Sequence, residues 1–260
     1  MELTFLGTGT SVGVPQMRCS CEVCRSKDPR DNRYRASAIV GLDDGRNILI
    51  DCGPDFRTQM LREGCPDLSC LLITHSHYDH VGGVDDLRPY AYSAPGGRFP
   101  VYCRPDVADD LRSRVPYCFA EKVYPGVPSF DMHEIDPSRP FDIGGGVEVA
   151  PLPVMHARLP IVGFRIGSLA YITDCKTMPD STLDLIRGVD ILVVNALRPE
   201  NHISHMNLRE ALDVIKEAAP RRAYLTHMSH DIGLHARRQE QLPRGVSLAC
   251  DGLHVRDIPY

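Results

Sequence analysis

The sequence lacks the features that mark membrane and exported proteins. No apolar run in its 260 residues approaches the roughly 18 residues that a membrane-spanning helix needs. Residues 1–10 have neither the basic start nor the apolar stretch of an export signal. We therefore expect a soluble, cytoplasmic protein with no membrane partner.

An excess of charge of one sign is also missing. The chain carries 34 acidic and 29 basic residues, spread along its length, and a formal net charge of -5. Such a balance gives no broad attraction for nucleic acid or for an anionic membrane. We expect no stable nucleic-acid partner, and an anionic substrate would have to be attracted by a local positive charge.

Internal repeats, low-complexity tracts and long linkers are absent as well. With 43% hydrophobic residues, a chain of this length can bury a substantial core, which favours one domain spanning residues 1–260. Its ten cysteines would permit disulfides in an exported protein. Because no export signal is present, we expect reduced thiols or metal ligands instead.

The recurring pattern is a short apolar or β-branched run that ends in a polar or glycine-containing turn. It predicts strands at residues 3–6, 38–42, 47–50, 69–73, 147–154, 161–166, 169–172, 191–194 and 222–225. Helical patterns occupy residues 54–63, 106–114, 179–187 and 207–217, and surface loops are expected at 31–35 and 95–98. Many strands and few helices favour antiparallel sheets covered by helices over a purely parallel sheet.

The densest group of potential metal ligands follows the predicted strand at 69–73. His75, His77, Asp79 and His80 stand within six residues. Imidazole nitrogen and carboxylate oxygen suit zinc, manganese or iron(II), and the alternation of His75 and His77 points two rings to one side. The alternative is a solvated polar loop, but three further potential ligands in similar positions argue against it.

Three further potential ligands, His156, Asp174 and His227, each follow a predicted strand. Taken singly, such a residue is more often an ordinary surface residue. When strands of a layered fold deliver polar side chains to one edge, however, the loops there form the usual concave site. Together with residues 75–80, the three complete two coordination shells.

This set resembles the metallo-β-lactamase superfamily, whose His-x-His-x-Asp-His signature corresponds to residues 75–80. The resemblance implies an αββα sandwich of two mainly antiparallel or mixed sheets flanked by helices. It assigns the ligands to two metal ions: His75, His77 and His156 to one, Asp79, His80 and His227 to the other, with Asp174 bridging both. Two ions about 3.5–4 Å apart lower the pKa of a shared water toward about 7.

One more residue matches the superfamily at the end of the predicted strand at 47–50. Asp51 stands there, before Cys52 and Gly53. The resemblance implies that Asp51 lies outside the ligand set and orients a ligand histidine.

Further motifs lie near both ends of the chain: residues 6–10 (Leu-Gly-Thr-Gly-Thr), 13–15, 226–230 and 251–252, and the cysteines Cys19, Cys21 and Cys24. They resemble the PhnP-type cyclic phosphodiesterases within the superfamily. The three cysteines lack one ligand of a tetrahedral zinc site. The resemblance supplies His230 as the fourth, and Cys52, Cys250 or His235 are the alternatives.

The resemblance also implies a catalytic histidine just before the helix at 207–217. His205 fits this position, where it would protonate the leaving oxygen or bind phosphoryl oxygens. His202 is the competing candidate. Residues 131–146 match no motif of the group, which leaves substrate size and leaving group open.

The predicted function is hydrolysis of a small, cyclic ribose phosphodiester to a phosphomonoester, with a phosphoribosyl cyclic phosphate or a 2′,3′-cyclic nucleotide as the substrate type. Asp79 and His205 are the predicted catalytic residues, two zinc or manganese ions the catalytic cofactors, and one zinc ion the structural cofactor. The oligomeric state is open, and a homodimer is compatible with the sequence.

Three other functions compete with this prediction. A transfer-RNA 3′-processing nuclease shares the ligands but would need a Gly- and Lys-rich arm, which is absent from the sequence. Thioester or lactone hydrolysis gives no reason for the cysteine site. A non-catalytic metal or nucleotide sensor would not need the complete ligand set.

Overall fold

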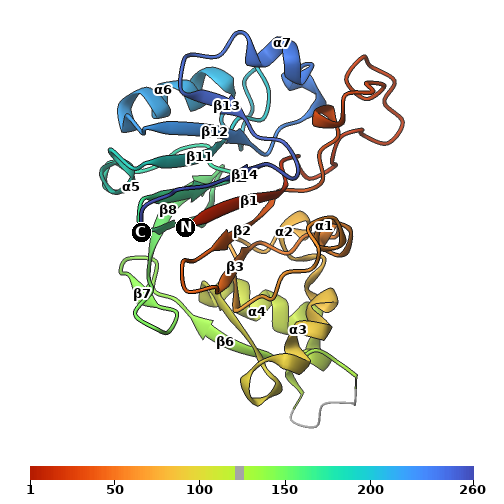
Figure 1. Cartoon of the computed structure of the whole chain (residues 1–260), viewed down its shortest axis with the longest axis vertical. Coiled ribbons are helices and arrows are strands. Elements are labelled where there is room, and N and C mark those ends of the chain that lie inside the picture. Colours follow the sequence, from red (N-terminus) through yellow and green to blue (C-terminus); the bar gives the residue numbers. More distant parts are fainter. Residues whose placement is uncertain (121–125) are drawn as a thin grey trace.

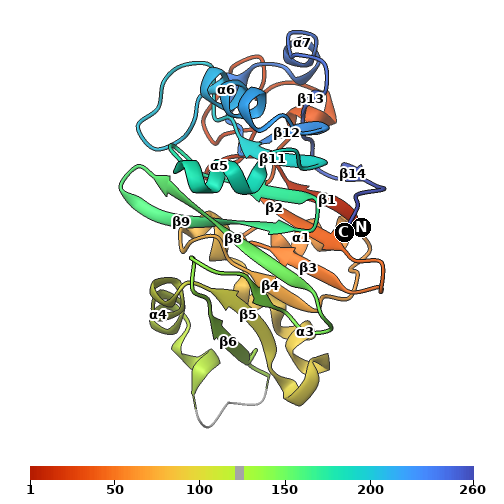
Figure 2. The same cartoon turned by 90° about the vertical axis from the view of Figure 1, so that its left-hand side faces the viewer.

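The computed structural model describes residues 1–120 and 126–260. Two seven-stranded sheets lie face to face at its centre, and helices cover their outer faces (Figures 1 and 2). The strand orders are β14-β1-β2-β3-β4-β5-β6 and β13-β12-β11-β10-β9-β8-β7. This arrangement confirms the predicted αββα sandwich.

The elements have the following bounds. The first sheet contains β1 (Glu2–Gly7), β2 (Ser37–Gly41), β3 (Asn47–Ile50), β4 (Cys70–Leu72), β5 (Phe99–Cys103), β6 (Phe130–Glu134) and β14 (His254–Val255). The second contains β7 (Phe141–Asp142), β8 (Glu148–His156), β9 (Leu159–Ile166), β10 (Leu169–Ile172), β11 (Ile191–Asn195), β12 (Arg222–Thr226) and β13 (Val246–Leu248). The helices are α1 (Phe56–Arg62), α2 (Tyr78–Val81), α3 (Arg88–Ser93), α4 (Pro105–Arg114), α5 (Asp180–Ile186), α6 (Leu208–Ala218) and α7 (His235–Gln239).

Each sheet is mixed, with an antiparallel half and a parallel half. In the first, β14, β1, β2 and β3 pair antiparallel and β3 to β6 pair parallel. In the second, β7 to β10 pair antiparallel and β10 to β13 pair parallel. Because parallel neighbours run in the same direction, the residues that follow β3 and β4, and likewise β10 to β12, emerge at a common edge of their sheet.

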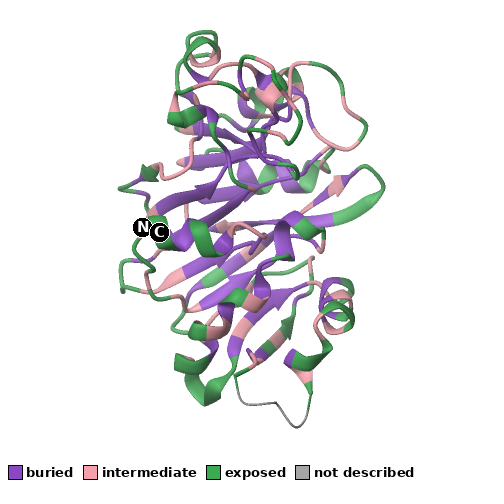
Figure 3. Ribbon diagram, turned by 90° about the vertical axis from the view of Figure 1, so that its right-hand side faces the viewer, coloured by how far each residue is buried: buried purple, intermediate pink, exposed green. Residues whose placement is uncertain are grey.

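Three apolar layers hold the sandwich together. In β3, Ile48 and Ile50 pack into the layer between the two sheets, whereas Leu49 packs into the layer that faces α1, α3 and α4. A further layer joins the second sheet to α5 and α6. Figure 3 shows the strands largely buried and the outer helical surfaces exposed. Burial on both faces explains why the central strands are continuous apolar runs with little alternation.

The predicted helices and strands are confirmed to within a few residues at their ends. The helix at 207–217 is α6, and its start is fixed by a capping box: the Asn207 side chain accepts from the Glu210 amide, and the Glu210 carboxylate accepts from the Asn207 amide. The sequence pattern missed β5 to β7, β13, β14 and the short helices α2, α3 and α7. In β6 the reason is clear, because three of its five side chains are polar and exposed.

The prediction that residues 31–35 form a surface loop is confirmed for Asn32 and Tyr34, which are exposed, and wrong for two other residues of the segment. Asp31 and Arg33 are buried, and Arg33 Nη2 lies 3.6 Å from Asp31 Oδ1. The Arg33 backbone pairs in both directions with Val14, which draws the segment beneath the N-terminal loop. A buried ion pair is invisible to a hydrophobicity pattern. Residues 95–98, by contrast, are exposed as predicted.

Within the described residues, none of the helices combines the length and the hydrophobicity needed to span a bilayer.

Candidate metal centre

Five of the predicted ligands lie at or just beyond the carboxyl ends of strands, and Asp79 and His80 lie in α2, which follows β4. His75 and His77 follow β4, and His156 is the last residue of β8. Asp174 follows β10 and His227 follows β12, and both have left-handed backbones with φ of 54° and 53°. Residues other than glycine rarely adopt this conformation, and such positions cluster at functional sites. The turns after β10 and β12 therefore orient the side chains of Asp174 and His227.

The structure brings these side chains into two adjoining groups, and in each group the ligand atoms lie within 4.8 Å of one another. The first group is His75, His77 and His156, and the second is Asp79, His80, Asp174 and His227. Asp174 is central, because its Oδ2 lies 3.2 Å from His80 Nε2 and its Oδ1 lies 3.1 Å from His227 Nε2. That the groups bind metal ions in the predicted manner stays a prediction.

Surrounding groups fix the orientation of the histidine rings. The buried Asp51 carboxylate lies 2.7 Å from His80 Nδ1 and also accepts from the Thr74 amide. His156 Nδ1 lies 2.9 Å from the Asp174 carbonyl oxygen and 2.8 Å from that of Ser204. Both rings consequently direct Nε2 at the cluster, which is the usual arrangement of metal-binding histidines.

The chemistry of the cluster fits a pair of divalent cations. His80 Nε2 is buried and, among the described residues, makes no hydrogen bond of acceptable geometry. Burial alone would lower the pKa of His80, but the carboxylates of Asp174 and Asp79 raise it well above its usual value. The buried carboxylates of Asp79 and Asp174 are thus stabilised by a positive charge near His80 Nε2. Nitrogen and carboxylate donors suit zinc and manganese.

One close approach of the backbone next to the centre requires glycine. A Cβ atom on Gly53 would lie 2.1 Å from the carbonyl oxygen of Asp79. Real Cβ atoms do not come so near to backbone oxygens, so any other residue would push the turn that carries Asp79 away. The Asp51-Cys52-Gly53 segment therefore positions both the His80 ring and the turn that carries Asp79.

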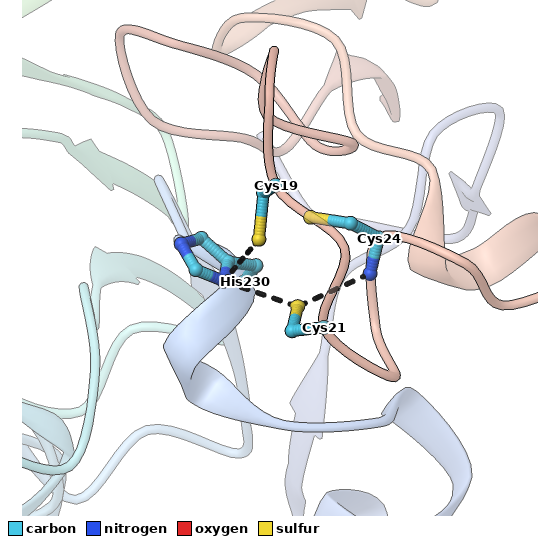
Figure 4. A group of neighbouring side chains, drawn as sticks. All are labelled: Cys19, Cys21, Cys24 and His230. Carbon is cyan, nitrogen blue, oxygen red and sulfur yellow. Dashed lines mark hydrogen bonds between the residues drawn. The ribbon is translucent and has the colours of Figure 1, made fainter.

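A second group of potential ligands joins the N-terminal loop to the segment after β12. Cys19, Cys21, Cys24 and His230 come together with all four ligand atoms within 4.8 Å of one another (Figure 4). His230 Nδ1 lies 3.3 Å from Cys21 Sγ and 3.8 Å from Cys19 Sγ. Three sulfurs and one imidazole nitrogen form a donor set typical of structural zinc.

The electrostatics favour a thiolate at Cys21, whereas burial raises the pKa of Cys24 to about 11. The Cys24 amide donates to Cys21 Sγ and, although burial opposes the effect, the pKa of Cys21 falls to about 6. The alternative ligands Cys52, Cys250 and His235 lie outside the group, and the His235 amide donates instead to the Asp31 carboxylate. All ten cysteines, each within the described residues, are free.

Breaking this group should release one zinc ion and leave the other metal ions bound. We expect Cys21→Ser to lower the melting temperature and to expose the first thirty or so residues to protease, because the loop has little apolar content and the larger core folds without it. His230→Ala should do the same, and the double variant should be little worse than either single one. Cys65→Ser, an exposed thiol outside the group, is the matched control.

Elemental analysis, thermal melting and limited proteolysis check this expectation. A His230→Ala protein that kept its zinc and its melting temperature would contradict a site built from three cysteines and His230.

His205 and His202 occupy different positions. His205 Nε2 lies 2.9 Å from Asp174 Oδ1, and its ring stacks on that of His227 with centroids 4.9 Å apart. The His202 ring lies on the outer side of His205, with the two ring centroids 5.1 Å apart. His205 is therefore the histidine that adjoins the metal centre.

Sequence reasoning missed the groups that act through the backbone. The Ser204 carbonyl, which accepts from His156, is one of them. A missed side chain is the partly buried Asp251, whose carboxylate accepts from the Thr8 hydroxyl and the Tyr34 amide and so ties the Gly-rich N-terminal segment to the C-terminal one. Burial raises the pKa of Asp251 to about 6. The Asp-Gly motif is visible in the sequence, but nothing in its pattern specifies these partners.

Comparison with known proteins agrees with this geometry. The family model described as Beta-lactamase superfamily domain matches residues 46–228, a span that includes all seven predicted ligands of the catalytic metal ions. The chain belongs to the metallo-β-lactamase superfamily, and its type is that of PhnP. The superfamily and the donor set imply bound divalent metal ions and support a metal-dependent hydrolase.

Three relatives are informative. The crystal structure of a new diphosphatase from the PhnP family is 38% identical, covers 99% of this chain and 98% of that one, and has a TM-score of 0.91. An octanoyltransferase from Porphyromonas gingivalis is 40% identical over 256 residues, and the chain spans about half of its length, 98% of this chain against 51% of that protein. Ribonuclease Z from Mycobacterium bovis is 25% identical over 266 residues, which cover 90% of this chain and 88% of the nuclease.

Proposed function

We propose that the protein is a dinuclear-metal phosphodiesterase that hydrolyses a small, cyclic ribose phosphodiester to a phosphomonoester. The observation that carries the proposal is the position of His205 against the ligand cluster, with Nε2 2.9 Å from the carboxylate of Asp174, which belongs to the second ligand group and also groups with His156 and His205. A proton donor beside a site for two cations suits attack on phosphorus and departure of an oxygen. The similarity to a diphosphatase over nearly the whole chain supports phosphoryl chemistry.

The ligand residues would hold two divalent cations, which supply a water of lowered pKa and positive charge for phosphoryl oxygens. The chain's own groups prepare the site. Asp51 fixes the His80 ring, and the carbonyls of Asp174 and Ser204 fix the His156 ring. His205 donates its Nε2 proton to the leaving oxygen or to a phosphoryl oxygen of the bound ester.

The electrostatics of His205 depend on what binds beside it. Burial lowers the pKa of His205 to about 4, against the opposing effect of the Asp174 carboxylate. An anionic phosphate next to the ring would favour its protonated form. The substrate itself would then help to load the proton that the leaving group needs.

Ribonuclease activity is less favoured than hydrolysis of a small diester. The chain is similar to ribonuclease Z over most of its length. It has a net charge of -5 and no Gly- and Lys-rich arm in its sequence. With no excess of basic residues, the chain would gain little binding energy from a long polyanion.

A second candidate function is hydrolysis of an acyl thioester or ester. The observation in its favour is the 40% identity to about half of an octanoyltransferase. Because the match accounts for only half of that protein, the other half is free to carry the transferase reaction. The diphosphatase, by contrast, matches this chain end to end, so phosphoryl chemistry ranks first.

Turnover on a panel of substrates tests the proposal. The metallated protein should be offered bis(p-nitrophenyl) phosphate, 2′,3′-cyclic nucleotides, a phosphoribosyl cyclic phosphate, a diphosphate diester, an octanoyl thioester and a lactone, side by side. We expect hydrolysis of the cyclic diesters above all others. Turnover of the thioester alone would replace the proposal with the second candidate.

Removing the His205 ring should affect substrates according to their leaving groups. We expect His205→Ala to lower turnover of an alkyl or ribose phosphodiester by roughly 10²- to 10⁴-fold, the usual contribution of a general acid. Nitrophenyl esters should lose far less, because their phenolate leaves without a proton. Steady-state kinetics on both esters, with metal content as control, measure these losses. Equal losses of turnover on both esters would indicate that His205 binds the phosphate and does not protonate the leaving group.

A further inference from the structure

The loop that carries His202 and His205 is fixed at both ends. At its base, the Leu197 amide donates to the Met206 carbonyl and the Leu208 amide donates to the Arg198 carbonyl. The Met206 amide also donates to the carbonyl of Cys175, next to Asp174. The loop therefore cannot drift as a whole, and the side chains inside it decide how His205 points.

His205 is held from two opposite sides. On the inner side, its Nε2 lies 2.9 Å from Asp174 Oδ1, and its ring packs edge-on against His156 with centroids 4.6 Å apart. On the outer side, its Nδ1 lies 3.0 Å from the Ser204 hydroxyl and 3.1 Å from His202 Nδ1. Because the Ser204 amide donates to His202 Nδ1, that nitrogen acts as an acceptor. It can accept the Nδ1–H of a protonated His205, whereas the Ser204 hydroxyl can donate to Nδ1 of a neutral His205; in both cases the proton on Nε2 faces the centre.

The three side chains form a small closed network. The Ser204 hydroxyl lies 3.1 Å from His202 Nδ1, and the Ser204 amide donates to the same nitrogen at 3.3 Å. His202 makes no hydrogen bond to any predicted metal ligand within the described residues, and its ring is only partly buried. It adds no side chain to the apolar layers, so its contacts are confined to this network.

We propose that His202 and Ser204 are positioning residues that hold His205 with Nε2 directed into the metal centre. The role assigned to His205 rests on the proposed function, whereas the hydrogen bonds that orient it do not. His202 itself does not touch the reacting groups. It acts through the ring of His205, in the way that outer hydrogen-bond partners orient a metal-binding histidine.

Substitutions at residue 202 separate this role from a merely structural one. His202→Ala removes the His202 nitrogen that faces His205 Nδ1, whereas His202→Asn keeps a hydrogen-bonding atom at nearly the same place. On an alkyl phosphodiester we expect His202→Ala to lower kcat about 10- to 100-fold with little change in KM, and His202→Asn to retain most of it. Ser204→Ala should have a smaller effect on kcat, because the protonated His205 ring can still donate its Nδ1–H to His202 Nδ1.

A double-variant cycle tests whether His202 acts through His205. In a His205→Ala background, His202→Ala should cost almost nothing more, because the ring that it positions is gone. The same loss in both backgrounds, or a His202→Asn protein as impaired as His202→Ala, would overturn the proposal.

A measurement without substrate keeps the inference separate from the proposed function. In the zinc-loaded protein labelled with ¹⁵N-histidine, the ring nitrogen signals of His205, assigned with His205→Ala, report its tautomer. They should report one tautomer in the wild type and in His202→Asn, and a shifted or mixed one in His202→Ala. Unchanged signals in His202→Ala would overturn the inference even if phosphodiesters are hydrolysed; changed signals in a protein without phosphodiesterase activity would refute only the proposed function.

Discussion

Replacing Asp79 or His77 with alanine is expected to reduce hydrolysis by several orders of magnitude and to leave the fold largely intact. Asp79 lies in the ligand group that contains His80, Asp174 and His227, and His77 lies in the group that contains His75 and His156. Each variant removes one ligand from one predicted cation. The side chains follow β4 in a loop and a short helix, outside the main apolar layers, so their loss should cost little folding energy.

The measurement is steady-state turnover on bis(p-nitrophenyl) phosphate, together with circular dichroism and metal content. Asp86→Ala is the matched control, because Asp86 is an exposed carboxylate shortly after the same helix. Even outer partners of metal ligands contribute about 10- to 100-fold, so a first ligand should contribute at least as much. Activity above about a tenth of wild type in either variant would show that the two-metal assignment is wrong.

The second large effect is expected from Asp51→Asn, which replaces one carboxylate oxygen with an amide nitrogen. Asp51 is fully buried, and its Oδ2 lies 2.7 Å from His80 Nδ1 while Oδ1 accepts from the Thr74 amide. An asparagine that keeps the bond to Thr74 must point its amide group at His80. Two donors then meet, and His80 can accept from the new amide only by moving its proton to Nε2, the atom that faces the predicted metal ion.

We expect Asp51→Asn to weaken metal binding by about 10- to 100-fold and to lower activity in proportion. Titration of the metal-free protein with zinc or manganese measures the affinity, and Asp44→Asn, at an exposed turn, is the control. Wild-type affinity in Asp51→Asn would mean that Asp51 only supports the backbone turn at Thr74.

The parts of the site that local sequence motifs specify could be predicted, and those that depend on contacts between distant segments could not. The ligands are recognisable because side chains with the right donor atoms follow apolar strands, and the superfamily signature stands in residues 75–80. The fourth member of the cysteine group, His230, came from family resemblance, since spacing alone also allowed Cys52, Cys250 or His235. The structure brings His230 to the cysteines because the Met228 amide donates to the Thr8 carbonyl, and this pairing places the two segments side by side.

Other features could not be predicted because they depend on tertiary contacts. The burial of Arg33 follows from its backbone pairing with Val14, and the polar sequence around it resembles a surface loop. The short strands at the ends of the sheets have too little apolar content to stand out, as β6 demonstrates. The choice between His205 and His202 required coordinates, since only three residues separate them.

The central claim, that two cations bound by this cluster drive phosphodiester hydrolysis, is tested most directly by stoichiometric reconstitution. Protein stripped of its catalytic metal, with the cysteine-bound zinc retained, would be titrated with manganese while turnover of bis(p-nitrophenyl) phosphate and a 2′,3′-cyclic nucleotide is followed. We predict that activity rises from the background to a plateau at two equivalents per chain and that His77→Ala and Asp79→Ala never reach it. A plateau at one equivalent, or no turnover of either ester at any metal content, would contradict the claim.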